Sequence, residues 1–234
     1  VEASGVTVTL ARSSGEPLTP ALLQQRLLAL PFAVELQSLA VNDFRLEGST
    51  PLVIERMAGV LTLSDGGLRL QDASVQLPQA TFSGAVELQA DLSLQAALKW
   101  QWQRDGRDYG GDLELGGSLQ QLSISHALTA PLRITSTGTL QPGLFAGSVV
   151  TLDLQHSAAT QSLQVFGQPT LSVGGSVASV GPLDALRVDA ALALEMPQLA
   201  PLTVELALLS RTDAVRIERL AIASTELDLQ GSGN

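Results

Sequence analysis

The sequence offers few residues whose types and spacing could support catalysis. Its only histidines are His126 and His156, and neither has a second histidine or a carboxylate at the spacing typical of metal ligands. Metal binding and acid–base catalysis both need several such groups that converge on one point. We therefore interpret each histidine as a solvated or packed side chain and expect no metal site.

A cluster of acids and glycines is the next pattern with chemical potential. Asp105, Asp108 and Asp112 lie among glycines, but their spacing does not match the calcium loop of an EF-hand. No serine lies in a Gly-x-Ser-x-Gly turn, and the chain has no cysteine for thiolate chemistry. Gly174-Gly175 precedes no predicted helix, which removes the usual anion-binding geometry. We expect a protein that is not an enzyme and binds no cofactor.

Composition and charge limit the classes of partner. Hydrophobic residues make up 45% of the 234 residues, whereas charged residues make up 15%, well below the roughly 25% usual in soluble domains. The formal net charge is −10, with 13 Lys and Arg among 23 Asp and Glu. Because a phosphate backbone is bound by clustered cations, these numbers argue against nucleic acid. They equally argue against adsorption onto an anionic membrane surface.

The stretch Val215–Gly231 is the unit that repeats along the chain. Its first half follows the pattern apolar-x-apolar-x-x-apolar-x-apolar, with Val215, Ile217, Leu220 and Ile222 at the apolar positions. Alternation with period two predicts a strand with one apolar face. The extra residue at Glu218-Arg219 changes the phase once, as a β-bulge or corner would. A second strand with Leu227 and Leu229 then ends at Gly231.

Two further stretches follow the same frame. In each, a pair of polar residues interrupts the alternation, at Gln71-Asp72 in one copy and at Gln37-Ser38 in the other. We expect the sheet to turn a corner at each of these pairs. The apolar positions are Leu68, Leu70, Ala73 and Val75 followed by Ala80, Phe82 and Gly84, and Val34, Leu36, Leu39 and Val41 followed, after a shorter turn, by Phe44, Leu46 and Gly48.

The stretch Asp91–Gln103 predicts the longest strand. Leu, Ala and Trp alternate there with Gln, Ser and Lys, as expected for an antiparallel sheet with one side in solvent. We predict that Arg104–Gly111 is the hairpin loop and that Leu113 and Leu115 begin the return strand. Trp100 and Trp102 either cap a core or line the rim of a groove, and the sequence leaves both interpretations open.

One short helix is predicted at about 20–30. Thr19 is a suitable N-cap, Pro20 fits the first helical position, and Pro31 disfavours continuation. The remainder reads as strands, so we expect residues 1–234 to form a single elongated β segment, weakest at 138–148. The longest apolar run is too short to span a bilayer. We also expect the chain to be an interior segment of a longer protein.

These features together resemble TamB and the wider AsmA-like family of periplasmic envelope-bridging proteins, with TamB preferred. The resemblance is carried by the helix and Leu30–Val34 before Leu36–Val41, by the phrases Gly117–Leu128 and Gly181–Leu192 with their shared Gly-x-Leu-x-x-Leu start, and by Val215–Gly231. It covers most of the chain, from about Leu18 to the end.

The resemblance implies an all-β fold: an elongated, mostly antiparallel sheet curled lengthwise into a trough. It implies a periplasmic segment of a protein anchored in the inner membrane of a Gram-negative bacterium, with the anchor outside this stretch. The implied role is outer-membrane biogenesis, by transport of phospholipid or by assembly of outer-membrane and autotransporter proteins. The implied partners are phospholipid acyl chains and an outer-membrane barrel protein of the TamA kind.

We predict that one apolar face lines the groove. The residues assigned to this lining are Leu92, Leu94, Leu98, Trp100, Trp102, Leu113, Leu115, Ile124, Val188, Leu192, Leu194, Ile217 and Ile222. The alternative is a non-catalytic structural β-sandwich or β-solenoid, for example part of a surface adhesin, in which the apolar faces seal against each other. An open face would support the groove, and a close-packed second layer would support the sandwich.

Overall fold

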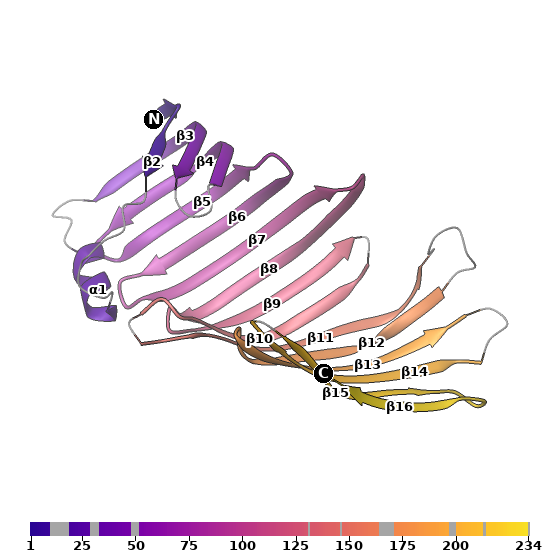
Figure 1. Ribbon diagram of the computed structural model, residues 1–234. Helices are drawn as coiled ribbons and strands as arrows, with labels where there is room; N and C mark the ends of the chain where they lie inside the picture. Colours follow the sequence, from indigo (N-terminus) through magenta and orange to yellow (C-terminus); the bar gives the residue numbers. More distant parts are fainter. Residues whose placement is uncertain are drawn as a thin grey trace. The chain divides into compact units, whose positions relative to one another are not determined.

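The computed structural model describes residues 1–9, 19–28, 33–47, 52–130, 132–145, 147–163, 171–196, 200–212 and 214–233. These residues form strands, apart from one short helix, and nearly all strand pairs are antiparallel (Figure 1). The predicted fold class, a mostly antiparallel sheet with a single short helix, is confirmed. The helix α1 spans Pro20–Leu28, close to its predicted position, and Thr19 caps it through its side chain.

The strands follow one another along the chain with short connections. The first group is β1 (Glu2–Ser4), β2 (Thr7–Thr9), β3 (Val34–Glu47), β4 (Leu52–Ser64), β5 (Gly67–Gln76), β6 (Ala80–Gln89), β7 (Ser93–Arg104) and β8 (Arg107–Ser118). The second group is β9 (Gln121–Ala130), β10 (Ile134–Pro142), β11 (Val150–Leu163), β12 (Leu171–Pro182), β13 (Ala185–Glu195), β14 (Leu202–Arg211), β15 (Val215–Ala223) and β16 (Asp228–Gly233).

The chain divides into two compact units. Unit 1 comprises Val1–Leu122, Thr129–Pro131 and Gly143–Ser148, and unit 2 comprises Ser123–Leu128, Leu132–Pro142 and Val149–Asn234. In unit 1, strands β3 to β8 each pair antiparallel with the next strand, and β1 and β2 pair parallel with β3. In unit 2, β10 to β16 pair antiparallel in chain order. The prediction of one elongated segment concerns the arrangement of these units and stays a prediction.

The register shifts lie where the polar pairs of the sequence predicted them. Pairing is interrupted between Leu36 and Leu39 in β3, between Leu70 and Ala73 in β5, and between Ile217 and Leu220 in β15. The strand keeps its apolar residues on one face because the extra residue restores the phase after the bend. The predicted change of phase is therefore confirmed as a register shift at each polar pair, and the corner of the sheet at these pairs stays a prediction.

A glycine on the following strand stands opposite each of these bulges. Gly59 pairs with Leu39, Gly84 pairs with Ala73, and Gly231 pairs with Leu220. At Gly84 the backbone has φ +147°, and a Cβ would collide with the carbonyl oxygen of Ala97. Only glycine fits that conformation without strain. The glycine that closes two copies of the repeat therefore sits opposite the bend of the preceding strand.

The third copy of the repeat does not fold as predicted. We expected a turn before Phe44, but β3 continues as one strand from Val34 to Glu47, and its partner glycine comes from β4. Asp43 takes a positive φ of 53°, so the backbone departs from regular geometry without ending the strand. The shorter spacer holds too few residues for a turn. Gly48 lies outside the described residues.

Two local boundaries around β7 also differ from the prediction. The hairpin after it is a tight turn at Asp105-Gly106, and β8 begins at Arg107, so Arg104–Gly111 is not a loop. The predicted loop was too long because its glycines and charges are compatible with strand positions near a sheet end. Leu92 precedes the strand in a turn with φ 66°, where we had predicted a strand residue.

Candidate functional site

Unit 1 presents an apolar face made of rows that cross its strands. Residues that pair directly across neighbouring strands project to the same side of a sheet. The paired rows run Leu63, Leu68, Leu88 and Leu94; Leu36, Leu61, Leu70, Val86, Ala96 and Leu115; Ala73, Gly84, Leu98 and Leu113; and Val41, Met57, Val75, Phe82, Trp100 and Gly111. Every residue in these rows is glycine or has a mainly apolar side chain, and the indole N–H of Trp100 is the one side-chain hydrogen-bond donor among them.

This apolar face is only half-buried. Leu94, Leu98 and Trp100 are intermediate in exposure, whereas Gln95 and Lys99 on the other face of β7 are exposed. None of the described side chains is completely buried. Within each unit, extensive backbone contacts between described elements join neighbouring strands of the sheet and form no second layer. The face is therefore shielded by its own side chains rather than by a packed core.

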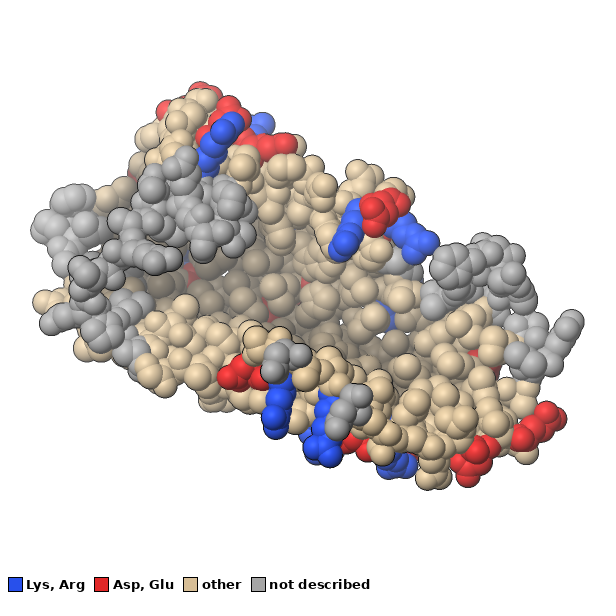
Figure 2. Space-filling model, viewed as in Figure 1, with Lys and Arg blue, Asp and Glu red and all other residues tan. Residues whose placement is uncertain are grey.

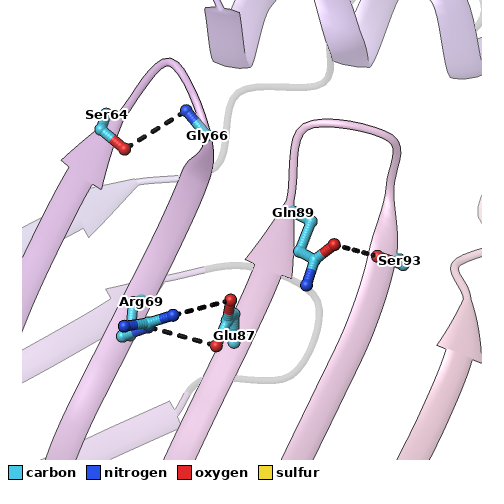
Figure 3. A network of polar contacts seen from close by, with 6 residues as sticks. All are labelled: Ser64, Gly66, Arg69, Glu87, Gln89 and Ser93. Atoms are coloured by element: carbon cyan, nitrogen blue, oxygen red, sulfur yellow. Dashed lines mark hydrogen bonds and ion pairs between the residues drawn. The ribbon is translucent and has the colours of Figure 1, made fainter.

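The opposite face of unit 1 is polar and is held by pairs between strands (Figure 3). Arg69 on β5 donates two hydrogen bonds to the carboxylate of Glu87 on β6, at 3.0 and 3.1 Å, and the Ser93 hydroxyl donates to Gln89 at 3.1 Å. The hydrogen bond from Arg69 lowers the pKa of the Glu87 carboxyl, because it stabilises the charged form. Charged groups thus lie on the side away from the apolar rows.

Figure 2 shows where charge gathers on the viewed surface. Lysine, arginine, aspartate and glutamate side chains collect near strand ends and hairpins, and the broad surface between them is almost uncharged. One such end carries an aromatic cluster: the Trp102 and Tyr109 rings lie 5.5 Å apart, and the Arg104 guanidinium stands 5.4 Å from the Trp102 ring centroid. Trp102 thus lies at the charged margin, whereas Trp100 lies within an apolar row beside Phe82.

Unit 2 carries a similar face with polar interruptions. Its paired rows run Gly175, Leu192, Val204, Ile222 and Leu229; Ser136, His156, Val177, Ala190, Leu206 and Leu220; and Leu154, Ser179, Val188, Leu208 and Ile217. Ser136 and His156 stand directly opposite each other, and the His156 Nδ1 and Ser136 Oγ atoms lie 2.7 Å apart. A histidine and serines therefore belong to an otherwise apolar surface.

An open groove of about 350 Å³ lies beside this histidine. It is lined by Leu132, Ile134, His156, Ser157, Ala158, Gln161, Val173, Gly174, Gly175, Val177, Ser179 and Leu192. The hollow coincides with a register shift of β11 between Ala158 and Gln161, which faces the glycine pair on β12. A Cβ at Gly174 would lie 2.9 Å from the Thr160 hydroxyl oxygen. The bulge and the missing side chains together create the groove.

The predicted groove-lining residues fall on the apolar faces of both units. Leu94, Leu98, Trp100, Leu113 and Leu115 lie on the rows of β7 and β8, and Val188, Leu192, Ile217 and Ile222 lie on those of β13 and β15. Trp102 lies on β7 at the charged margin, and Leu194 lies on β13 opposite Val173 and Leu202. Ile124 lies on β9 at intermediate exposure. Leu92 is buried in its turn, with 4% of its surface exposed. Only Leu192 of the set borders the groove in unit 2.

The remaining residues of this groove were missed by sequence reasoning. His156 was interpreted as a solvated or packed side chain and not as part of a binding surface, although Leu152, Leu154 and His156 share a phase in β11. That alternation could have placed the histidine on the apolar face. The bulge at 158–161 carries no polar pair like those of the repeat, so nothing in its local pattern marked the hollow. Ser136 was out of reach because its pairing with His156 depends on strand register.

Other site types were sought among the described residues. In that part of the chain, no cluster of histidine and carboxylate side chains could hold a metal ion. No helix of the described ranges has the length and apolar character needed to cross a membrane. Among the described residues, the apolar faces of the two units and the groove of unit 2 offer apolar surface to a ligand.

Comparison with known proteins gives this architecture a family. The family model described as TamB, N-terminal domain matches residues 7–234, which is nearly the whole chain. The chain belongs to the TamB family, a family of envelope-associated, non-catalytic transport and assembly proteins. Comparisons with curated proteins and with solved structures gave no significant match.

Proposed function

We propose that this chain is a periplasmic segment of a TamB-like protein that bridges the inner and outer membranes and carries phospholipid acyl chains on its apolar faces. The observation that carries the proposal is the set of unbroken, half-exposed apolar rows in unit 1. Binding to such a surface is favourable because it removes hydrocarbon from water. It does not fix the orientation of the bound hydrocarbon. That suits fluid acyl chains, which must move, better than a rigid ligand.

The elongated trough belongs to the same proposal. Bulges bend the strands at Leu36–Leu39, Leu70–Ala73 and Ile217–Leu220 while the apolar residues stay on one face. Repeated bends of this kind would curl the sheet around its apolar side. The anchor in the inner membrane and an outer-membrane partner of the TamA kind would lie in other parts of the protein.

Assembly of outer-membrane and autotransporter proteins remains part of the proposed role, because an apolar face also shields the strands of an unfolded barrel protein. The sealed structural sandwich is less compatible with the half-exposed rows, since a sandwich buries its inner faces to form a core.

Mass spectrometry of lipid retained by the purified chain tests the proposal. The chain would be purified without detergent from a Gram-negative host, and bound lipid would be extracted and quantified. We expect phospholipid at a substantial fraction of one molecule per chain. A chain that is folded by circular dichroism but free of lipid, also after incubation with phospholipid vesicles, would contradict the acyl-chain role.

A further inference from the structure

The groove in unit 2 is apolar at its Val173 end apart from Gln161, and its other end, called the polar end below, carries His156 and Ser179. Val173, Gly175, Val177 and Ser179 line it in this order along β12. Leu132 lies near the Val173 end, because its neighbour Arg133 bonds through its backbone to Gln161, which pairs with Val173. At the other end, His156 pairs with Val177 and is a diagonal neighbour of Ser179. The lining is thus amphipathic along the strand direction.

Hydrogen-bonding capacity is left open at the polar end. The Gln161 side chain, at the Val173 end, is already bonded to the backbone of Arg133, and the Ser157 hydroxyl lies 2.8 Å from that of Thr135. By contrast, within the described chain the Nε2 atom of His156 and the hydroxyl of Ser179 have no protein partner. Neither atom is sealed from solvent, since no buried polar side-chain atom in the described ranges lacks a bond. Both are accessible to a ligand.

Both open groups can donate hydrogen bonds in one tautomer of His156. When the Ser136 hydroxyl donates to Nδ1 of His156, the ring proton resides on Nε2, which then donates outward. The Ser179 hydroxyl donates likewise. Among the residues that the structure describes, no lysine, arginine, aspartate or glutamate lines the groove. A phosphate placed there would lose hydration without gaining a cation, whereas the carbonyl of an ester is a neutral acceptor that matches these donors.

The size of the groove limits its occupant. A volume of about 350 Å³ is near the lower end of the roughly 300–1,000 Å³ usual for small-molecule sites. One acyl chain fits such a space, with its methylenes against Leu132, Val173 and Leu192. A strand of an unfolded protein would bring polar backbone groups against Leu132 and Val173, whose side chains offer no hydrogen-bond partner for them.

We propose that this groove seats one ester-linked acyl chain of a phospholipid, with the ester carbonyl accepting hydrogen bonds from His156 Nε2 and Ser179 Oγ. This inference rests on the proposed function and adds a recognition step to it. The rows of unit 1 hold no serine or histidine and bind hydrocarbon without distinction, whereas unit 2 distinguishes the ester. Recognition is independent of the headgroup, which remains outside the groove.

Competition between two lipids tests the inference. The full chain would be incubated with an excess of an equal mixture of ester-linked and ether-linked phosphatidylethanolamine of the same chain length. Native mass spectrometry would give the ratio bound. We expect about a fivefold preference for the ester, the value of one net hydrogen bond.

Variants of the two proposed donors test whether these residues cause the preference for the ester. His156→Leu and Ser179→Ala should each bring the ratio toward one while lipid is still retained. Gln155→Leu changes an exposed residue on the other face of the same strand and should keep the preference. If His156→Leu fails to fold, Ser179→Ala still decides, because it removes a single hydroxyl.

The outcomes separate this inference from the proposed function. Retention of both lipids in equal amounts by the unchanged chain would overturn ester recognition and leave acyl-chain carriage standing. A preference that persists in both folded variants would overturn the assignment to His156 and Ser179. Retention of neither lipid would overturn the proposed function itself.

Discussion

The apolar faces of the two units share a backbone design and differ in side-chain chemistry. In unit 1, the rows through Leu98 and Trp100 hold only apolar residues and glycine. In unit 2, Ser136, His156 and Ser179 interrupt rows of the same kind, and a glycine pair leaves a hollow beside them. The repeat therefore specifies the bulges of the strands and their apolar face. What that face recognises is set separately by the few polar residues within it.

The largest expected effect comes from a charge placed on the apolar face of unit 1. Leu98→Arg should reduce retained phospholipid at least tenfold, because an unpaired charge among apolar rows opposes hydrocarbon binding. The matched control is Ala97→Arg, at the exposed neighbouring position on the other face of β7, which should leave retention unchanged. Lipid would be quantified by mass spectrometry, and folding by circular dichroism. Loss of folding only in Leu98→Arg would point instead to a sealed core.

The shared bulge-and-glycine design can be compared at equivalent positions of the repeat. Gly84→Ala in unit 1 should lower the free energy of unfolding by about 1–3 kcal/mol, because φ is +147° and a Cβ meets the Ala97 carbonyl. Gly231→Ala in unit 2 should stay within about 0.5 kcal/mol, since no atom lies within 4 Å of the added Cβ. Denaturant titration measures both. Equal costs would show that the bulge itself, rather than the local contact, requires glycine.

The hollow of unit 2 can be filled selectively. Val177→Trp places a large ring in the groove beside His156 and should reduce ester-lipid binding about fivefold, the loss of one net hydrogen bond or its equivalent in contact. Val180→Trp is the control, because Val180 is 43% exposed on the other face of β12. A photoreactive lipid would report crosslinks to each unit separately. Equal loss of crosslinks in both units would contradict a distinct seat in unit 2.

The smallest effect concerns the charged pairs on the polar faces. Hydrogen bonding to Arg69 lowers the pKa of Glu87 below its ordinary 4.5, and hydrogen bonding to Arg187 lowers that of Asp189 below 3.8. A carboxyl whose pKa is lowered by folding stabilises the fold above its unfolded pKa, and this contribution is lost as pH falls through the folded value.

The two pairs differ in what they join, which makes them separable. Arg69 and Glu87 join β5 to β6, whereas Arg187 and Asp189 lie on one strand. Glu87→Gln should therefore flatten the loss of stability of unit 1 as the pH falls below 4.5, the ordinary pKa of Glu87, slightly more than Asp189→Asn flattens that of unit 2 below 3.8. Amide hydrogen exchange measured at several pH values gives the stability of each unit separately, because peptides from the two units are analysed individually. If the stability of unit 1 falls equally steeply at low pH with and without Glu87, the proposed contribution of the pair between Arg69 and Glu87 is contradicted.

Much of this architecture was accessible from the sequence because its determinants are local. Period-two alternation in Asp91–Gln103 placed one apolar face, and the polar pair Gln71-Asp72 marked a change of phase that the structure shows as a bulge. The helix start followed from Thr19 and Pro20 for the same reason. Each depends on a few neighbouring residues and on side-chain direction alone.

The failures arose where local signals had more than one solution. The spacer at Asn42-Asp43 suited either a short turn or a continued strand, and pairing with β4 selected the strand. Glycines after Asp105 suited a loop or the first residues of a strand near the end of the sheet, and the register with β7 selected the strand. In both cases hydrogen bonds to a neighbouring strand outweighed local preference.

By itself, the sequence determined that this chain is all-β, that each strand has one apolar face, and where the phase of the repeat changes, because these properties follow from residue period and from the conformations open to each residue. Tertiary structure alone decided which glycine faces which bulge, that Ser136 meets His156, and that a hollow opens beside them. Those facts depend on register between strands that are separate in the chain, and a shift of one residue would turn every one of these side chains to the other face.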